Sequence, residues 1–161
     1  MIRKAEKKDL ESVMPIYEEA RKRMRASGNM TQWINGYPSL SLITEDIKNG
    51  DFYIVTEDEE IIGAFSFIIG EEPTYQMIEG NWINNNPYGT IHRIVSSGKK
   101  KGILKECLDY CFTKIDNIRI DTHKDNKIML EAVRKYGFSE CGTIWVSDGS
   151  PRIAFQRKIM G

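Results

Sequence analysis

Three consecutive lysines followed by a glycine, Lys99 to Gly102, are the residues of this chain best suited to bind a phosphate. Before them, the β-branched residues of Thr90–Val95 favour a strand. After them, apolar residues from Ile103 onward recur with helical spacing. A loop that opens into a helix presents unpaired backbone N–H groups, and lysines add positive charge. Ser97–Leu104 is therefore predicted to bind a phosphate or pyrophosphate, although short lysine runs often form plain solvated turns.

The length and charge of the chain limit its classes of function. At 161 residues it is long enough to bury a core, and residues 1–161 are expected to form one domain. Lys plus Arg and Asp plus Glu both number 23, and this balance argues against nucleic-acid binding. No signal peptide or membrane-spanning apolar run is recognised, so we expect a cytoplasmic protein with no membrane partner.

The cysteines carry no signature of a metal centre. There are three of them, Cys107, Cys111 and Cys141, and none forms a Cys-x-x-Cys pair, so no metal is expected. Cys107 and Cys111 lie on the apolar stripe of the helix that follows the lysine loop. This position favours buried, reduced thiols over a redox site.

The segments before the lysine loop predict two helices and three strands. We expect a strand over residues 1–6, a helix from Leu10 capped by Asp9, a short helix over Leu40–Asn49, and a hairpin of Phe52–Thr56 and Ile61–Ile69 joined by a solvated acidic turn. The connections Met30–Tyr37 and Gly70–Tyr88 are rich in aromatic and amide side chains. Long loops of this kind are usually functional.

The segments after the loop predict a strand–helix–strand unit. Ile118–Thr122 reads as a strand, and its separation from Thr90–Val95 by one helix makes the two strands parallel. Asp125 or Asn126 is expected to cap the next helix. Cys141–Val146 and Arg152–Lys158 then form a closing hairpin.

In its order of elements and in two motifs, nearly the whole chain resembles the GNAT superfamily of N-acetyltransferases. The family pattern Arg/Gln-x-x-Gly-x-Gly/Ala corresponds here to Lys99-Lys100-Lys101-Gly102-Ile103-Leu104, with Lys99 in place of Arg or Gln and Leu104 in place of the last small residue. The pattern Asn-x-x-Ala-x-x-x-Tyr-x-x-x-Gly-Phe is matched by Asn126, Gly137 and Phe138, with Met129 at the alanine and Val133 at the tyrosine.

The resemblance implies an α+β fold with a mixed, mostly antiparallel sheet of about six to seven strands, a central splayed parallel pair, and helices on both faces. It implies an acetyl-CoA-dependent N-acetyltransferase in which a primary amine of a small molecule or protein attacks the thioester directly in a ternary complex. Val133 stands where the family's tyrosine protonates the departing thiolate. A catalytically weak or inactive acyl-CoA-binding module is therefore the alternative.

The resemblance also implies which residues bind acetyl-CoA. The expected set is Ile94, Val95, Gly98, Lys99, Lys100, Lys101, Gly102, Ile103, Leu104 and Asn126. The backbone of Arg93–Val95 is expected to bond the pantetheine arm and to polarise the acetyl carbonyl.

Candidate acids and bases follow from the same resemblance. His92, Asp121 and His123 are the candidate bases, and of these Asp121 is expected to be a structural partner of Arg93 or Arg119 rather than a base. Tyr136 is the first candidate acid, with Tyr75 and Tyr88 as others. Each also has a structural interpretation, in which His92 is packed in its strand and His123 caps a helix.

Four aromatic residues of the two long connections have two interpretations. Trp33, Tyr75, Trp82 and Tyr88 are expected either to wall the site of the amine acceptor or to contact a second subunit. The second interpretation would make the protein a homodimer.

Overall fold

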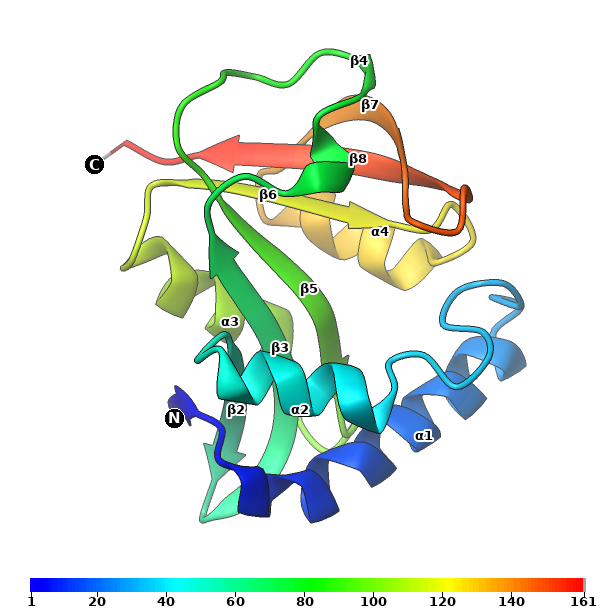
Figure 1. The fold of residues 1–161 in the computed structure, drawn as a ribbon, viewed down its shortest axis with the longest axis vertical. Helices are drawn as coiled ribbons and strands as arrows, with labels where there is room; N and C mark the ends of the chain where they lie inside the picture. Colours follow the sequence, from blue (N-terminus) through cyan, green and yellow to red (C-terminus); the bar gives the residue numbers. More distant parts are fainter. Residues whose placement is uncertain (161) are drawn as a thin grey trace. The chain divides into compact units, whose positions relative to one another are not determined.

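The structure is a computed structural model that describes residues 1–160. Its strands are β1 (Ile2–Lys4), β2 (Phe52–Glu57), β3 (Glu60–Ile69), β4 (Glu79–Gly80), β5 (Gly89–Ser96), β6 (Asn117–Thr122), β7 (Ser139–Trp145) and β8 (Pro151–Lys158). Its helices are α1 (Leu10–Ala26), α2 (Leu40–Lys48), α3 (Ile103–Phe112) and α4 (Lys127–Lys135), with short 3-10 helices η1 (Lys7–Asp9) and η2 (Pro73–Tyr75). Figure 1 shows the chain coloured along its sequence.

The chain falls into two compact units. Unit 1 comprises Met1–Phe67 and His92–Tyr110, and unit 2 comprises Ile68–Ile91 and the chain from Cys111 onward. The strand β5 and the helix α3 each contribute residues to both units.

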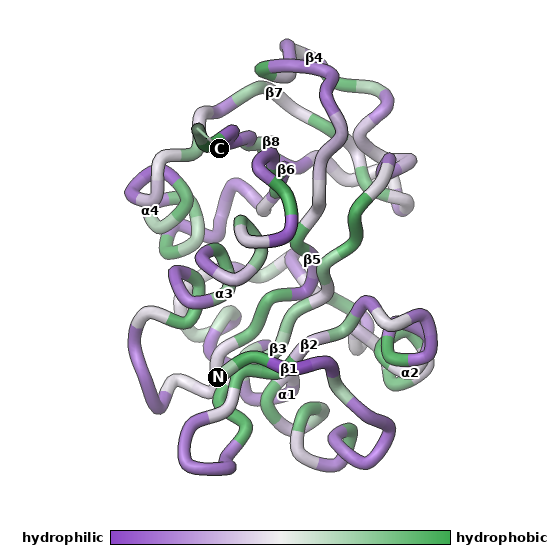
Figure 2. The backbone as a smooth tube through the Cα atoms, turned by 90° about the vertical axis from the view of Figure 1, so that its left-hand side faces the viewer, coloured by the Kyte–Doolittle hydropathy of each residue, from purple (hydrophilic) through white to green (hydrophobic). Residues whose placement is uncertain are grey.

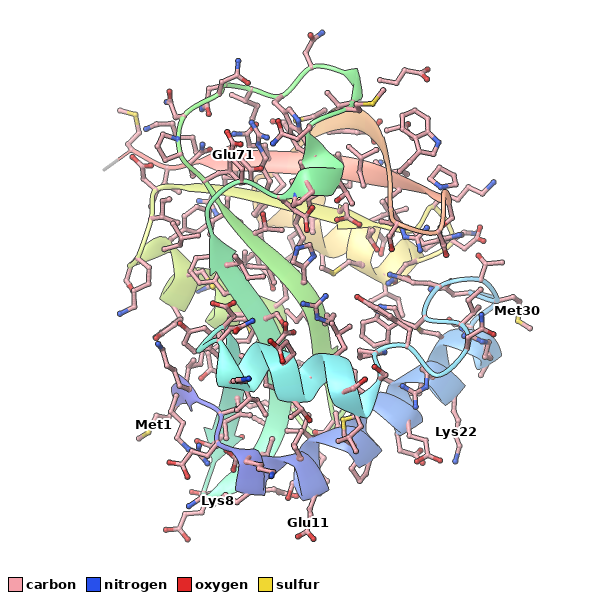
Figure 3. All side chains as sticks on the ribbon, in the orientation of Figure 1. Met1, Lys8, Glu11, Lys22, Met30 and Glu71 are labelled. Carbon is pink, nitrogen blue, oxygen red and sulfur yellow. The ribbon has the colours of Figure 1, made fainter. Side chains whose placement is uncertain are left out.

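In unit 1 the strands β1, β2 and β3 pair antiparallel, with β5 next to β3 in the strand order. Figures 1 and 2 show α2 and α3 on opposite faces of these strands. Apolar residues of α1, α2 and the strands form one core: Ala5, Val13, Tyr17, Ala20, Ile43, Phe52, Ile54, Ala64 and Val95. The polar face of α1 is turned outward, as the side chains of Glu11 and Lys22 show (Figure 3).

The close approach of β3 to β5 favours a glycine at position 63. A Cβ atom at Gly63 would lie 3.0 Å from the carbonyl oxygen of Val95 and 3.0 Å from Cγ2 of Ile103. Contacts this short are tighter than most Cβ contacts, so a larger residue would require its neighbours to shift by a few tenths of an ångström.

Unit 2 contains the predicted parallel pair. β5 pairs parallel with β6 through Gly89↔Ile118 and Thr90↔Arg119. β6, β8, β7 and β4 then follow in antiparallel order. Tyr75, Tyr88, Ile144 and Ala154 form the buried centre of this unit.

The predicted fold class is confirmed: an α+β fold with an open, mostly antiparallel sheet and one parallel pair. The sheet has eight strands where six or seven were expected, because Glu79 and Gly80 of the long connection form the short strand β4. No helix among residues 1–160 is long and apolar enough to cross a membrane. The one-domain organisation stays a prediction.

Candidate functional site

The loop between β5 and α3 leaves a run of backbone N–H groups free. Ser97 N donates to the carbonyl of Ile62, and the amides of Gly98 and Lys99 donate to the hydroxyls of Ser96 and Ser97. Within residues 1–160, no acceptor is assigned to the amides of Lys100–Leu104. These amides lie at the start of α3, where helices bind anions.

Gly102 leaves space beside these amides. Its φ is +84°, a conformation that favours glycine, and no atom lies within 4 Å of the position that its Cβ would occupy. A phosphate group can therefore approach the backbone at this point. The residues of the loop fit the phosphate-binding role that the sequence predicts.

Two of the three loop lysines pair with the glutamates that end β2 and begin β3, on either side of the turn that joins these strands. Lys99 forms an ion pair with Glu60, and Lys100 Nζ lies 3.6 Å from Glu57 Oε1. Both glutamates stay exposed in these pairs, as expected of a solvated acidic turn. Across the described chain, Lys101 is the lysine of the three that has no ion-pair partner.

A fourth cation lies beside the loop. Arg23 of α1 donates from Nη2 to the carbonyl of Ser96 at 2.5 Å. Its guanidinium carbon lies 3.8 Å from the position that a Cβ of Gly98 would occupy. Arg23 was not predicted from the sequence, because 73 positions separate it from Ser96 and no local spacing connects them.

Along β5, Arg93 interrupts the regular strand. Its φ is +54°, in the left-handed region that residues other than glycine rarely adopt. Its neighbours on either side are predicted site residues: His92 and Ile94 are half-buried, and Val95 is buried in the core of unit 1.

The guanidinium of Arg93 lies in a polar cluster of unit 1. Its Nη2 lies 2.8 Å from Oδ2 of Asp46, and its Nη1 donates to the hydroxyl of Tyr37 at 3.0 Å. The Ser66 hydroxyl donates to the same oxygen of Asp46 at 2.7 Å. Asp46, Ser66 and Tyr37 were not predicted as site residues, because they come from three separate segments of the sequence.

The candidate base His123 in unit 2 is buried, with 7% of its surface exposed. Its Nδ1 accepts a hydrogen bond from the backbone N–H of Asp125 at 3.0 Å, so that nitrogen is unprotonated. Burial, with a contribution from Arg152, lowers the pKa of His123 below its ordinary value. These contacts agree with the structural interpretation of His123, in which it orders the turn before α4.

Asn126 and Tyr136 lie at the two ends of α4. The Asn126 side chain accepts from the amide of Met129 at 3.1 Å and so caps the helix, as predicted. Tyr136 ends the helix, is half-buried, and accepts at its carbonyl from Arg157 at 2.8 Å. Val133, at the position of the family's tyrosine, is 1% exposed.

Three of the four predicted acceptor-site aromatics lie together in unit 2, packed around an arginine. Arg119 lies 4.1 Å from the ring centre of Trp82 and 4.0 Å from that of Tyr88. Tyr75 packs against both rings. Since 1% of Tyr75 and 5% of Tyr88 are exposed, most of their surface is already buried. Their role in acceptor binding stays a prediction.

Asp121 was expected to pair with Arg93 or Arg119. The structure instead pairs it with the hydroxyl of Tyr75, which donates to Oδ2 at 2.6 Å. Burial raises the pKa of Tyr75 well above its ordinary value, so this phenol keeps its proton. The fourth aromatic, Trp33, belongs to unit 1 and packs against Tyr17 at 5.4 Å between ring centres.

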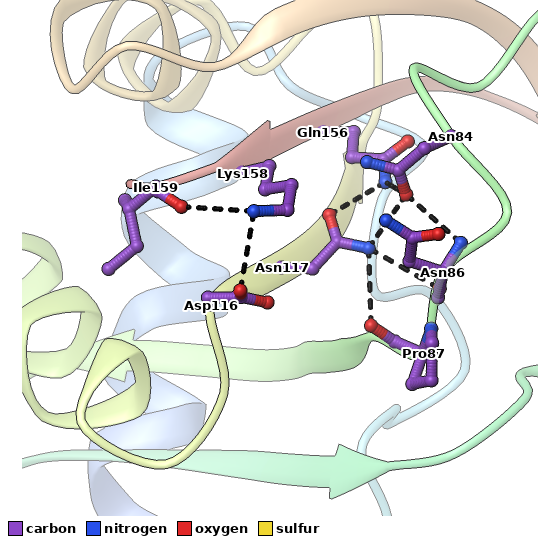
Figure 4. Close-up of polar contacts among 8 residues, drawn as sticks. All are labelled: Asn84, Asn86, Pro87, Asp116, Asn117, Gln156, Lys158 and Ile159. Atoms are coloured by element: carbon purple, nitrogen blue, oxygen red, sulfur yellow. Dashed lines mark hydrogen bonds and ion pairs between the residues drawn. The ribbon is translucent and has the colours of Figure 1, made fainter. Parts of the chain in front are cut away.

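Buried amide side chains fix the loop that carries Trp82 and Tyr88 (Figure 4). Asn117 donates to Oδ1 of Asn84 at 2.9 Å and also to the carbonyls of Asn86 and Pro87. Gln156 donates to Asn84 and Asn117 and accepts from the amide of Ile83. Asn117 and Gln156 are fully buried, and these bonds satisfy their amide groups.

Known structures resemble this chain over its whole length. A GNAT-family acetyltransferase from Streptococcus agalactiae is 31% identical, with a TM-score of 0.90 and coverage of 100% of this chain and 96% of that one. A GNAT-family acetyltransferase from Listeria monocytogenes is 19% identical, with a TM-score of 0.70 and coverage of 99% and 94%. A ribosomal-protein-alanine N-acetyltransferase from Brucella melitensis is 16% identical, with a TM-score of 0.66 and coverage of 99% of both chains.

The two more distant likenesses support the fold alone. No family model and no curated protein matches the sequence. The Streptococcus agalactiae protein, however, shares both sequence and fold with this chain from end to end. The chain belongs to the GNAT family of acetyltransferases, and we therefore regard it as a transferase of acetyl groups.

Proposed function

We propose that the protein is an acetyl-CoA-dependent N-acetyltransferase that acts on a primary amine by direct attack in a ternary complex. The observation that carries the proposal is the loop between β5 and α3. Within residues 1–160, no acceptor is assigned to the amides of Lys100–Leu104. In the same segment, Gly102 leaves open space beside the backbone and Lys101 adds a positive charge. Unpaired backbone amides at a helix start, with a cation beside them, favour the binding of a diphosphate.

In this proposal the loop binds the diphosphate, and β5 binds the acyl end of the donor. Bound acetyl-CoA supplies the activated acetyl thioester. The backbone N–H groups of Ile94 and Val95 are proposed to donate to the acetyl carbonyl. Donors of this kind contribute about 2.7–4 kcal/mol of transition-state stabilisation.

We propose His92 as the base that takes the proton of the amine. It lies on β5 beside Arg93, next to the proposed amide donors of Ile94 and Val95, and is half-buried. A free α-amine with a pKa near ~8 requires about 1.4 kcal/mol to deprotonate at neutral pH, whereas a lysine near ~10.4 requires about 4.6. A single imidazole suits the first acceptor better. Tyr136 remains the proposed acid.

An N-terminal α-amine is therefore the first acceptor to test. The Brucella melitensis relative is named for a ribosomal-protein alanine, and a peptide that begins with alanine belongs in the panel for this reason. The same peptide with an acetylated N-terminus and one internal lysine separates the two kinds of amine. Trp33, which is half-buried and belongs to unit 1 as His92 does, is the aromatic that we propose to border the acceptor.

The test combines calorimetry with an assay for free thiol. We expect the protein to bind coenzyme A and to release it from acetyl-CoA when an amine acceptor is present. Mass spectrometry should find one added acetyl group on the acceptor. Absence of coenzyme A binding would rule out the proposal.

The alternative function is an acyl-CoA-binding module without turnover. The buried Val133 favours it, because a hydrocarbon side chain cannot protonate a departing thiolate. Calorimetry that shows tight binding, together with no thiol release against any amine of the panel, would support this alternative.

A further inference from the structure

Arg93 has a backbone conformation that its position in the sequence does not explain. Its φ of +54° lies in the left-handed region, which is strained for a residue with a side chain. The other non-glycine residues with positive φ in the described chain lie in a connection or a hairpin turn: Trp33, Asn35, Asp58 and Glu59. Arg93 is the one that lies inside a strand. Such strain persists only when the surrounding structure imposes it.

The side chain of Arg93 is held by three groups from different segments. Its Nε donates to Oδ2 of Asp46 at 2.9 Å and lies 3.3 Å from the hydroxyl of Ser66. Its Nη1 donates to Tyr37. Asp46 is 6% exposed and Ser66 is fully buried, so the bonds of Arg93 to these two residues are protected from competition by water.

The backbone of Arg93 is held separately. The hydroxyl of Tyr17 on α1 donates to the carbonyl oxygen of Arg93 at 2.5 Å. Tyr17 is fully buried, and burial raises its pKa well above the ordinary value, so the hydroxyl stays a donor. The residue is therefore fixed at both its side chain and its main chain.

We propose that four residues form a clamp that holds the backbone of Arg93 in the left-handed conformation: Tyr17, Tyr37, Asp46 and Ser66. The clamp thereby orients the N–H groups of Ile94 and Val95 toward the acetyl carbonyl. A change of φ at Arg93 rotates the following peptide planes relative to the preceding strand, and these donors move with them. Arg93 and the members of the clamp are positioning residues. The inference rests on the proposed function of the Ile94 and Val95 amides.

Two substitutions at one position separate the backbone conformation from the side chain. Arg93→Ala and Arg93→Gly both remove the guanidinium and leave Asp46 without its partner. Glycine adopts a positive φ freely, whereas alanine does not. We expect kcat to fall by about tenfold or more in Arg93→Ala, since misplacing an oxyanion donor has effects of this size, and clearly less in Arg93→Gly. Equal losses in the two variants, or no loss in either, would overturn the inference.

A binding measurement gives a second readout. The difference in affinity between coenzyme A and an unreactive ketone analogue of acetyl-CoA reports the contact with the acetyl carbonyl. We expect Arg93→Ala to lose this difference while it binds coenzyme A as the wild type does. Arg93→Gly should retain it in part. Parallel loss of both affinities would show general damage and contradict the clamp.

Tyr17→Phe keeps the inference testable should both Arg93 variants fail to fold. It removes one hydroxyl and keeps the buried ring. We expect a threefold or greater fall in kcat, on the order of one lost hydrogen bond, with an unchanged Kd for coenzyme A. An unchanged kcat would count against the clamp. Failure of the wild type to bind coenzyme A would instead refute the proposed function itself.

Discussion

Arg93 of β5 and Asp46 of α2 form a buried ion pair: the guanidinium lies 2.8 Å from the carboxylate, and 11% and 8% of the two side chains are exposed. A buried charge depends on its partner, because the protein interior solvates it poorly. This pair therefore links the conformation of β5 to the helix α2 in unit 1.

Asp46→Ala should destabilise the protein strongly, because it leaves the Arg93 cation buried and unpaired. We expect the free energy of unfolding to fall by about 3–5 kcal/mol in urea titrations. Asp109→Ala is the control, since the Asp109–Lys105 pair is 67% and 60% exposed and should cost at most ~1 kcal/mol. Equal losses in the two variants would contradict the special role of the buried pair.

Replacing Glu57 and Glu60 together by glutamine should strengthen binding of coenzyme A. The change frees Lys99 and Lys100 from their partners and removes negative charge near the loop. Exposed pairs of this kind are worth about 0.2–1 kcal/mol each, so we expect a gain of about two- to fivefold in affinity at low salt. The gain should shrink as salt is added.

Glu59→Gln is the matched control for this experiment, because Glu59 lies in the same turn and is exposed. It should leave the affinity nearly unchanged. Calorimetry at two salt concentrations measures all three proteins. Weaker binding by the double variant would show that the acidic turn supports the ligand rather than competing with it.

Gly102→Ala should weaken coenzyme A binding by about tenfold, since the loop can no longer hold φ near +84° without strain. Gly149→Ala provides a close control. Gly149 has the same φ of +84° and open space around its Cβ position, but it lies in the turn between β7 and β8. Both variants should lose similar stability, and only Gly102→Ala should lose affinity. Equal affinity of the two variants would remove Gly102 from the binding site.

The stability of the protein should fall as the pH drops below about 6.5, in part because of His123. Burial lowers its pKa in the folded protein below the value of 6.5 for the unfolded chain. The unfolded chain therefore binds more protons in this window, and stability rises with pH through it. His123→Asn, whose side-chain oxygen can accept from the Asp125 amide, removes this titration. Urea titrations between about pH 5 and 7.5 should show a weaker pH dependence for the variant.

Local sequence patterns were sufficient for most elements. The β-branched run before the lysine loop is β5, and the apolar stripe after it is α3. The strands β5 and β6, which α3 connects, pair in parallel as predicted. Asn126 caps α4 as predicted. These features depend on the spacing of residues that are close in the sequence, and the regular geometry of a helix or a strand fixes what each spacing means.

One local prediction was wrong in a specific way. Asp9 was expected to cap α1, but its side chain makes no such bond; it accepts from the amide of Glu6 at 2.7 Å and pairs with Arg3 at 2.9 Å. The helical path begins earlier, in η1, so Asp9 closes a capping box one turn before α1. The spacing of Glu6 and Asp9 was the signal in the sequence.

The sequence by itself determined the strand, the loop with its lysines and Gly102, and the helix that together form the predicted phosphate site, because these residues are consecutive. Only the tertiary structure decided that Glu57 and Glu60 pair with those lysines, and that Tyr17, Tyr37, Asp46 and Ser66 surround Arg93. These partners come from distant segments that meet only when helices and strands bury their apolar faces. Their contacts follow from packing, which no spacing along the chain encodes.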